Sequence, residues 1–391
     1  MFATLALVVA ASLVGPLLAA GRRPIVPVVV GEIGAGLILG KSGFGWIDPT
    51  VVPLPSLSSI GFILLMFAAG ARIQFDSPAF AAGARRAVVA LALVAGASIP
   101  AALLLARVSG EGSPGWIAVL LAGSSAAIVL PVLAEQGIDP ALTAALVAWV
   151  AIADTATVVL LPLAIGQTGS PLTALVSDAA IVAAAAVILV AGIRLRTWGP
   201  MHVLWDRSRK RGWALQMRAA LVLVFIFGAV AETWGGSQLV AGFVAGLVLG
   251  RLREPSRLAT QLGGVADGFF VPVFFVLLGA RLDLHALLGD PAALVFLALD
   301  AALVVAVHLF GSLAMPRGRV SAGLAASVQL GLPSAAATLG LQSGVISPAL
   351  AAALVGAALL TLIPGSIGSF RLAGDLADRR PDAVATPRGA S

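Results

Sequence analysis

Long apolar runs separated by short polar loops dominate the hydrophobicity pattern of this chain. Each run approaches the roughly 20 residues that a helix needs to cross the hydrocarbon core of a bilayer. Runs without alternation of apolar and polar residues do not suit the strands of a membrane barrel. The pattern therefore predicts an all-α polytopic membrane protein with about 13 transmembrane helices. The predicted spans lie near residues 2–20, 24–40, 56–71, 86–106, 115–134, 141–164, 172–193, 214–231, 236–250, 264–280, 292–314, 320–343 and 348–370.

The spans occur in two copies, and the second copy is inverted. Four short motifs recur at offsets of 208 to 210 residues, and an odd number of spans separates the copies, so the copies must cross the membrane in opposite directions. Inverted repeats are typical of secondary transporters, whose substrate site lies near the middle of the bilayer between them. The recurring motifs are AGLILG (35–40) with AGLVLG (245–250), GAR (70–72) with GAR (279–281), SAA (125–127) with SAA (334–336), and PALTAALV (140–147) with PALAAALV (348–355).

The repeats form one membrane domain, predicted over residues 1–370. The first repeat is expected over about 1–165 and the second over about 214–370, joined by a helix at about 172–193. Twenty-one of the 24 Lys and Arg residues fall in alternate loops and the C-terminal tail, which places these regions in the cytoplasm. We predict a multi-pass inner (plasma) membrane protein with its N-terminus outside and its C-terminus in the cytoplasm. Residues 371–391 are polar and are expected to form a short disordered tail.

Composition narrows the possible functions. Hydrophobic residues make up 60% of the chain and charged residues 11%, with a mean hydropathy of +1.05. There is no cysteine and there are only three histidines, so disulfides, thiol catalysis and a His-rich metal site are not expected. The net charge of +6 lies in short loops between spans and does not indicate nucleic-acid binding. No nucleophile–base pair or phosphate loop is recognisable, so we expect neither an enzyme nor a cofactor, and no metal beyond a transported monovalent cation.

Asp154 is the strongest candidate for an ion-binding residue. It lies near the middle of the span 141–164, roughly 15 Å or more from either membrane surface. A charge at that depth is costly and usually functional. The neighbouring Thr155 and Thr157 offer oxygen ligands, and a carboxylate can hold either a proton or a cation, which is the simplest basis for antiport. The alternative is a structural aspartate that pairs with a buried base or bonds to a neighbouring helix.

The fifth and twelfth spans carry Gly, Pro and hydroxyl residues in mid-span, at related places in the two repeats. This favours helices with unwound backbone, which is tolerated in a membrane only where it lines a cavity or is buried in protein. The alternative is ordinary packing of small residues between helices. The candidate residues are Ser124, Ser125 and Pro131 in the fifth span, and Gln329, Pro333, Ser334 and Thr338 in the twelfth.

Four further titratable residues fall within or at the ends of spans. Asp300 and His308 lie on broadly the same side of the span 292–314, about two turns apart, and could couple protonation to transport. A neutral hydrogen-bonded histidine and a helix-bonded aspartate are the alternative. Glu32 is expected to play a structural role, paired with a base such as Arg72 or Arg281. Glu232 is expected at the outer end of the span 214–231, near the interface.

The chain resembles the monovalent cation:proton antiporters of the sodium/proton exchanger superfamily, the branch that includes the glutathione-gated potassium efflux systems. The resemblance rests on VGEIGAGLILG (30–40), LLMFAAG (64–70), GSSAAIVLP (123–131), the segment around Asp154, residues 232–246 and FFVPVFFVLLG (269–279). It implies crossed broken helices and a homodimer. It also implies a dimerisation domain of spans 1–3 and 8–10, and a mobile core of spans 4–6 and 11–13 that moves as an elevator. Asp154 matches the family's ion-binding carboxylate, and Ser124 and Ser125 match polar positions of its first broken helix.

Three positions depart from the family pattern. Ala153 stands where the residue before the carboxylate is usually Asp, Asn or Gln, which removes a ligand and favours one-for-one exchange. His308 lies close to a position that is often Lys or Arg, and Arg72 replaces an acidic residue. The resulting prediction is a secondary active transporter that exchanges Na⁺ or K⁺ for H⁺, in contact with membrane lipid and without nucleic acid. A solute symporter on the same fold and a non-transporting membrane sensor or channel are the alternatives.

Overall fold

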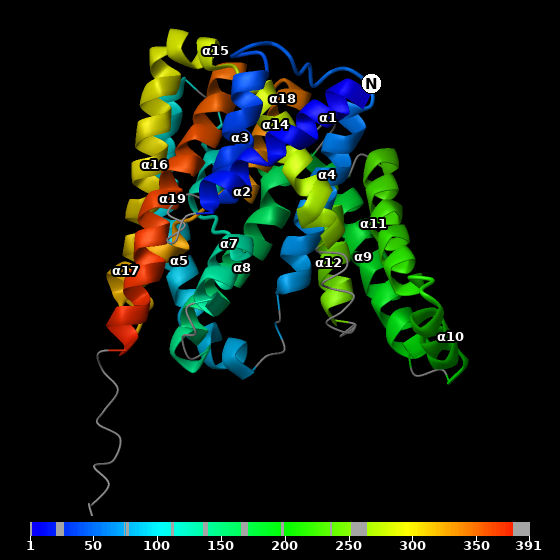
Figure 1. Cartoon of the computed structure of the whole chain (residues 1–391). Coiled ribbons are helices and arrows are strands. Elements are labelled where there is room, and N and C mark those ends of the chain that lie inside the picture. Colours follow the sequence, from blue (N-terminus) through cyan, green and yellow to red (C-terminus); the bar gives the residue numbers. More distant parts are fainter. Residues whose placement is uncertain are drawn as a thin grey trace, which may run out of the picture.

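The computed structural model describes residues 2–20, 27–73, 75, 78–110, 113–135, 140–165, 171–196, 199–234, 237–251 and 264–377. These residues form helices joined by short connections, and no strand occurs among them (Figure 1). The helices are α1 (Phe2–Ser12), α2 (Val14–Ala19), α3 (Val28–Leu39), α4 (Leu54–Arg72), α5 (Pro78–Ser109), α6 (Pro114–Leu121), α7 (Ala126–Glu135), α8 (Pro140–Ile165), α9 (Pro171–Arg196), α10 (Gly199–Arg211), α11 (Leu215–Trp234), α12 (Gln238–Arg251), the π-helix η1 (Ala266–Phe270), α14 (Val271–Arg281), α15 (Leu284–Gly289), α16 (Pro291–Gly311), the 3₁₀-helix η2 (Ser312–Ala314), α17 (Arg319–Ala326), α18 (Gly331–Ser343) and α19 (Pro348–Ala377).

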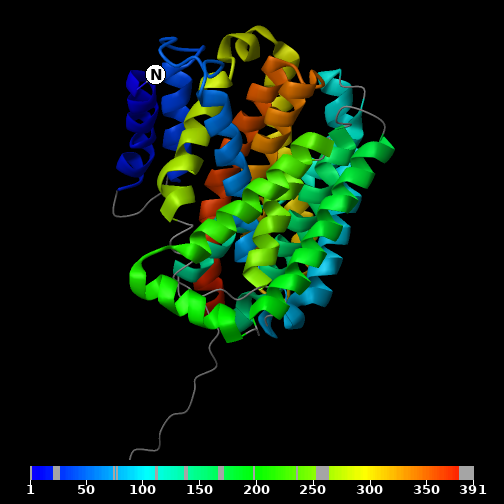
Figure 2. The ribbon, with the colours of Figure 1, turned by 90° about the vertical axis from the view of Figure 1, so that its right-hand side faces the viewer.

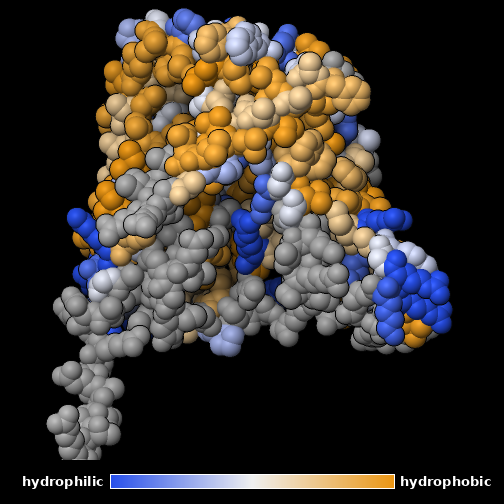
Figure 3. All heavy atoms as spheres, viewed as in Figure 1, coloured by the Kyte–Doolittle hydropathy of each residue, from blue (hydrophilic) through white to orange (hydrophobic). Residues whose placement is uncertain are grey.

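The helices have the length and composition of a multi-pass membrane protein. Among the described residues, eight helical segments are at least 18 residues long and apolar enough to cross a bilayer, and three shorter apolar helices lie at 28–39, 179–194 and 238–251. Where the surface is coloured in Figure 3, it is predominantly apolar over the upper half of the view, and hydrophilic residues lie along the top edge and in patches of the lower half. The all-helical polytopic fold predicted from the sequence is therefore confirmed, and the number of 13 spans stays a prediction.

Four helices, α3, α4, α12 and α14, form what we call the frame. Here α4 packs against α12, and α3 packs against α14. Glycines bring these helices into backbone contact, because a methyl group added at each one would collide with a carbonyl oxygen of the facing helix. The four contacts are Gly36 with Val276, Gly279 with Ile33, Gly70 with Phe243, and Gly246 with Phe67.

The glycine contacts explain two of the recurring sequence motifs. Gly36 and Gly246 occupy the same place in the AGLILG and AGLVLG motifs, and Gly70 and Gly279 occupy the same place in the two GAR motifs. The frame contains two equivalent helix crossings, α3 with α14 and α12 with α4. Each motif keeps a glycine at the same place in both crossings. Small residues at such crossings are the usual means of helix association in membranes, where lipid removes the hydrophobic driving force.

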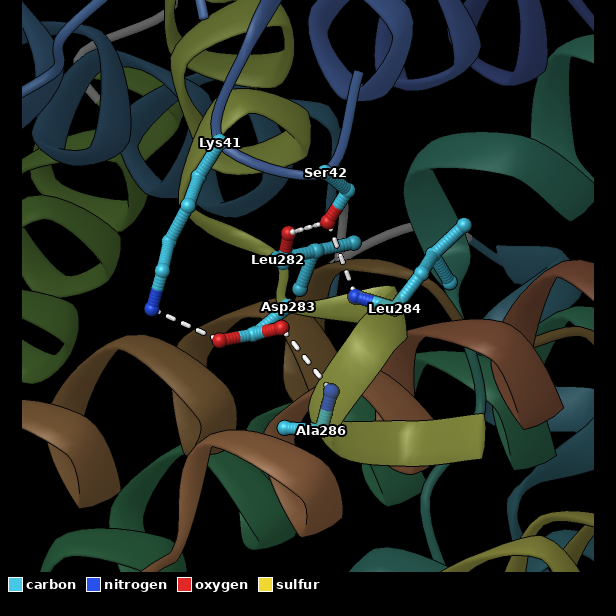
Figure 4. A network of polar contacts seen from close by, with 6 residues as sticks. All are labelled: Lys41, Ser42, Leu282, Asp283, Leu284 and Ala286. Atoms are coloured by element: carbon cyan, nitrogen blue, oxygen red, sulfur yellow. Dashed lines mark hydrogen bonds and ion pairs between the residues drawn. The ribbon is translucent and has the colours of Figure 1, made fainter. Parts of the chain in front are cut away.

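The repeat-related helices α4 and α14 run in opposite directions. The loop that joins α3 to α4 is bonded to residues 282–284, which directly follow α14 (Figure 4). Lys41 forms an ion pair with Asp283 at 2.6 Å. The Ser42 hydroxyl donates to the Leu282 carbonyl at 2.6 Å and accepts from the Leu284 N–H at 2.8 Å. The start of α4 and the end of α14 therefore lie on the same side of the molecule, as an inverted repeat requires.

Four long helices, α5, α8, α16 and α19, pack around two helices that are each split into halves, α6 with α7 and α17 with α18. We call these eight segments the core group. In it α5 packs against both α8 and α16, and α19 packs against α16 and α17. This group contains every predicted ion-site residue.

The C-terminal helix is longer than the sequence predicted. The expected disordered tail begins at 371, but α19 continues to Ala377. Leu372 is buried, and the Ser321 hydroxyl of α17 donates to the Asp375 carboxylate at 2.6 Å. These contacts hold the last two turns against α17, which is why the polar composition alone gave the wrong boundary. Residues 378–391 of the predicted tail lie outside the described residues.

Candidate ion site at the crossing of two broken helices

Two helices of the core group are interrupted at corresponding places. The first break spans residues 122–125, between α6 and α7, and the second spans 327–330, between α17 and α18. Each break interrupts the helical hydrogen-bond pattern inside the protein, where the freed backbone groups need other partners. The prediction of unwound backbone in the fifth and twelfth spans is confirmed.

The correspondence between the two breaks differs from the one that the sequence motif suggests. The bounds of α6 and α17, and the starts of α7 and α18, differ by 205 residues, whereas the two SAA motifs differ by 209. Ser124 therefore corresponds in structure to Gln329. Ser334, which the motif pairs with Ser125, instead lies within α18. The SAA motif begins three residues after the start of the first break but seven residues after the start of the second. An alignment of the two SAA motifs therefore places the two breaks four residues out of register.

Ser124 and Gln329 join the two breaks by reciprocal hydrogen bonds. The Ser124 hydroxyl donates to the Ala326 carbonyl, the last residue of α17, at 2.7 Å. The Gln329 side-chain amide donates to the Gly123 carbonyl, just beyond α6, at 2.7 Å. All four residues are buried. Each break therefore supplies one side chain that satisfies a carbonyl freed at the other break.

Asp154 lies at the first break, on α8. Its carboxylate accepts a hydrogen bond from the N–H of Ala126, the first residue of α7, at 3.0 Å, and its residue is only 8% exposed. The N-terminus of a helix carries a partial positive charge, which favours a negative group placed there. Within the described part of the chain, no other protein group is hydrogen-bonded to this carboxylate, so its second oxygen can accept a proton or a cation.

The hydroxyls next to Asp154 are bonded within their own helix. Thr155 donates to the Ala151 carbonyl and Thr157 to the Ala153 carbonyl, both at 2.7 Å. Such back-bonding uses the hydroxyl hydrogen and leaves the oxygen lone pairs as acceptors. Ser125 is buried beside Asp154's partner Ala126, at the end of the first break. A ligand role for these three residues stays a prediction.

The second break has no carboxylate at the place that Asp154 occupies in the first. There the Gln329 N–H lies 3.4 Å from the Thr361 hydroxyl oxygen of α19. Ser334 is buried, and its hydroxyl has no hydrogen-bond partner among the described residues. Thr338 donates back to the Ser334 carbonyl at 2.8 Å. Sequence reasoning did not select Thr361, although it lies only one residue away from the repeat mate of Asp154, Leu362.

The two prolines predicted to line a broken-helix cavity lie inside the second half-helices. Pro333 is the third residue of α18, where its missing N–H has no helical partner to lose. Pro131 lies in α7, and its side chain is outside the described part of the structure. The unwound residues precede both prolines, so the glycine and serine positions mark the breaks better than the prolines do.

His308 and Asp300 lie on α16, and both are buried. The His308 ring stacks on Trp149 of α8 with centroids 5.7 Å apart, and its Nδ1 lies 2.8 Å from the Val304 carbonyl. Its Nε2 has no hydrogen-bond partner within the described residues, and neither has one carboxylate oxygen of Asp300. The aromatic contact places His308 against the helix that carries Asp154. Asp300 lies about 12 Å from His308 along α16, towards the N-terminus of that helix.

The two glutamates lie outside the core group. Glu32 of α3 is buried and its side chain packs beside Gly15. Arg72, one of its predicted partners, forms an ion pair with Asp267 of η1 at 3.2 Å. The pairing of Glu32 itself stays a prediction. Glu232 is exposed two residues before the end of α11. Its interfacial position stays a prediction.

Inverted frame helices, two crossing broken helices and a buried carboxylate at a half-helix N-terminus define a membrane protein with the architecture of a secondary transporter. The chain matches the sodium/hydrogen exchanger transmembrane family over residues 8–372. It therefore belongs to that family, and the resemblance inferred from the sequence is confirmed.

Two curated relatives and one solved structure illustrate the family match. YjbQ of Bacillus subtilis is 29% identical over 316 residues, which is 76% of this chain and 50% of YjbQ. GerN of Bacillus cereus, a Na⁺/H⁺-K⁺ antiporter, is 27% identical over 265 residues, which is 66% of this chain and 65% of GerN. The chain thus spans between half and two thirds of the length of these relatives. The sodium proton antiporter MjNhaP1 of Methanocaldococcus jannaschii shares the fold, with a TM-score of 0.67 at 16% identity over 97% of this chain and 98% of that one.

Proposed function

We propose that this protein exchanges a monovalent cation, Na⁺ or K⁺, for H⁺ across the inner membrane. The observation that carries the proposal is the position of Asp154. Its carboxylate is buried at the start of α7, beside the crossing of the two breaks. Interrupted helices of this kind supply backbone oxygens to cations in transporters. The family membership and the antiporter activities named for its relatives point to the same function.

In this proposal Asp154 binds a proton and a cation alternately. The protonated carboxyl is neutral, and the cation-loaded carboxylate is compensated, so both forms can pass through an apolar environment. The empty carboxylate is held back, because burying an uncompensated charge in the membrane is costly. Ala153 adds no ligand, since its side chain is a methyl group, and a single carboxylate favours one cation per proton.

The frame and the core group suggest how access could alternate. The backbone contacts of α3 with α14 and of α4 with α12 leave little room for sliding, which suits a static part. The core group then moves as an elevator and carries Asp154 between the two sides. A homodimer joined through the frame, with the N-terminus outside and the C-terminus in the cytoplasm, completes the proposal.

The test is cation-induced proton movement in sealed vesicles that hold the full chain and a preset pH gradient. Na⁺ and K⁺ are titrated separately between pH 6 and 9. We expect one cation to collapse the gradient, Asp154→Asn to abolish the collapse, and the exposed control Glu232→Gln to retain it. Coupled exchange that persists in folded Asp154→Asn would overturn the proposal. Failure of every monovalent cation in the wild-type protein would favour a solute symporter, which the missing ligand at Ala153 makes the second candidate.

His308 is proposed to couple protonation to the ion site, because it stacks on Trp149 of the helix that carries Asp154. Lysine at this position remains charged to higher pH than histidine. His308→Lys should therefore shift the pH profile of exchange towards alkaline activity. An unchanged profile would return His308 to a packing role.

A further inference from the structure

The helix α10 follows one long apolar helix in the sequence and precedes another, but its own composition is polar. It connects the end of α9 to the start of α11, and it lies across the lower edge of the molecule in Figure 2. Its last turn is fastened to α11, because the buried Ser208 hydroxyl accepts from the Leu215 N–H and the Ser208 carbonyl accepts from the Trp213 N–H, both at 3.0 Å. Ser208 therefore marks the side of α10 that faces the protein.

The exposed surface of α10 is basic. Arg207, Lys210 and Arg211 are all exposed, and none of the three forms an ion pair with another described residue. Hydrophilic surface gathers over this helix at the lower right of Figure 3. Together they make this surface electropositive, and such a surface attracts anionic groups.

Apolar side chains accompany these cations. Val203 and Leu204, one to two turns before the basic residues, are 49% and 41% exposed. Helical spacing puts Val203 on the same face as Arg207 and Lys210. Trp213 is 43% exposed and lies under the Arg211 guanidinium, 5.3 Å from its ring centroid. Exposed tryptophan beside arginine is typical of the headgroup region of a bilayer.

We propose that α10 is a docking surface for the headgroups of anionic phospholipids. Arg207, Lys210 and Arg211 bind the phosphates, while Val203, Leu204 and Trp213 enter the boundary between headgroups and acyl chains. A membrane lipid satisfies both the charge and the apolar contacts, whereas a free anion would satisfy the charge alone. This inference does not rest on the proposed transport activity.

The chain contains no cysteine, so a single Val203→Cys substitution allows a nitroxide to be attached at one place in the full protein. The label is monitored by electron paramagnetic resonance while short-chain phosphatidylglycerol or phosphatidylcholine is titrated into the detergent-solubilised protein. We expect phosphatidylglycerol to immobilise the label. The triple substitution Arg207→Gln, Lys210→Gln and Arg211→Gln should weaken the apparent affinity roughly a hundredfold, since each basic residue near an anionic surface contributes about fivefold.

A matched control removes three exposed arginines elsewhere, with Arg85→Gln, Arg86→Gln and Arg317→Gln, and should leave the affinity unchanged. In the labelled protein without these changes, added NaCl should weaken the phosphatidylglycerol response, because salt screens exposed charges. An equal response to phosphatidylcholine, an equal response to inorganic phosphate, or indifference to salt would each overturn the proposal.

Discussion

The two breaks of the core group are built alike but differ in charge. At the first, the Ala126 N–H meets the carboxylate of Asp154, and at the second, the Gln329 N–H meets the hydroxyl of Thr361. The reciprocal bonds of Ser124 and Gln329 are shared between them. The repeat therefore provides a symmetric scaffold for unwound backbone, and a single acidic side chain makes one half of it the candidate ion site.

Replacing the acidic group by the group used at the second break should have the largest effect. Asp154→Thr keeps an acceptor for the Ala126 N–H but cannot carry a negative charge or a titrating proton. We expect exchange in vesicles to fall to the level of empty vesicles. As a control at the second break, Thr361→Ser keeps the hydroxyl acceptor and should retain exchange. The comparison fails if Asp154→Thr transports at a substantial fraction of the wild-type rate in protein that elutes as a single folded species.

Removing the reciprocal bonds should affect stability next most strongly. Gln329→Leu leaves the buried Gly123 carbonyl without its side-chain donor, which costs roughly 1–3 kcal/mol of unfolding free energy. Ser124→Ala leaves the buried Ala326 carbonyl without its donor and should cost a similar amount, roughly 1–3 kcal/mol. Thermal unfolding in detergent measures both. If the two changes add in the double variant, the bonds act independently; if they do not, the breaks are coupled.

The smallest effect is expected at the ion pair between the two repeats, outside the spans. The hydrogen bond from Lys41 and the Ala286 N–H lower the pKa of the Asp283 carboxyl below its usual value. The folded state therefore binds this proton less readily than the unfolded state. The resulting stabilisation is present above the usual aspartate pKa of about 3.9 and is lost as pH falls through the folded pKa.

Asp283→Asn should accordingly lower the unfolding temperature only slightly near pH 6, since an ion pair with a solvent-exposed lysine contributes up to about 1 kcal/mol. The difference from the wild-type protein should shrink as pH falls below about 4. Unfolding curves recorded between pH 3 and 7 test this. A difference that grows with acidity would contradict the assignment.

The sequence predicted the architecture, and it singled out Asp154 as the candidate carboxylate, for physical reasons that are local. Span length and loop charge follow from the bilayer, and Asp154 stands out because a charge at mid-span is rare. The AGLILG and GAR motifs were visible because each must keep a glycine at a close crossing. These features leave a mark at one position of the chain.

The contacts that assemble the site leave no such mark. Ser124 bonds to Ala326 and Gln329 to Gly123 across more than 200 residues, and only the relative placement of two half-helices decides those partners. The SAA motifs even indicated a different correspondence, because their similarity reflects small-residue packing as much as descent from one repeat. Thr361 was missed since a lone threonine in an apolar span is common, and its partner lies on another helix.

The glycine contacts of the frame also bear on how the protein is made. Gly36 packs against Val276 and Gly70 against Phe243. The helices α3 and α4 therefore cannot pack against their frame partners until the second half of the chain has entered the membrane. At about 5–20 residues per second, Gly36 waits roughly ten seconds to a minute for Val276 to be synthesised. During that interval α3 and α4 present bare glycine faces to lipid or to the insertion machinery. A chain whose synthesis stops halfway would keep these glycine faces unpaired, and membrane quality control could then recognise it.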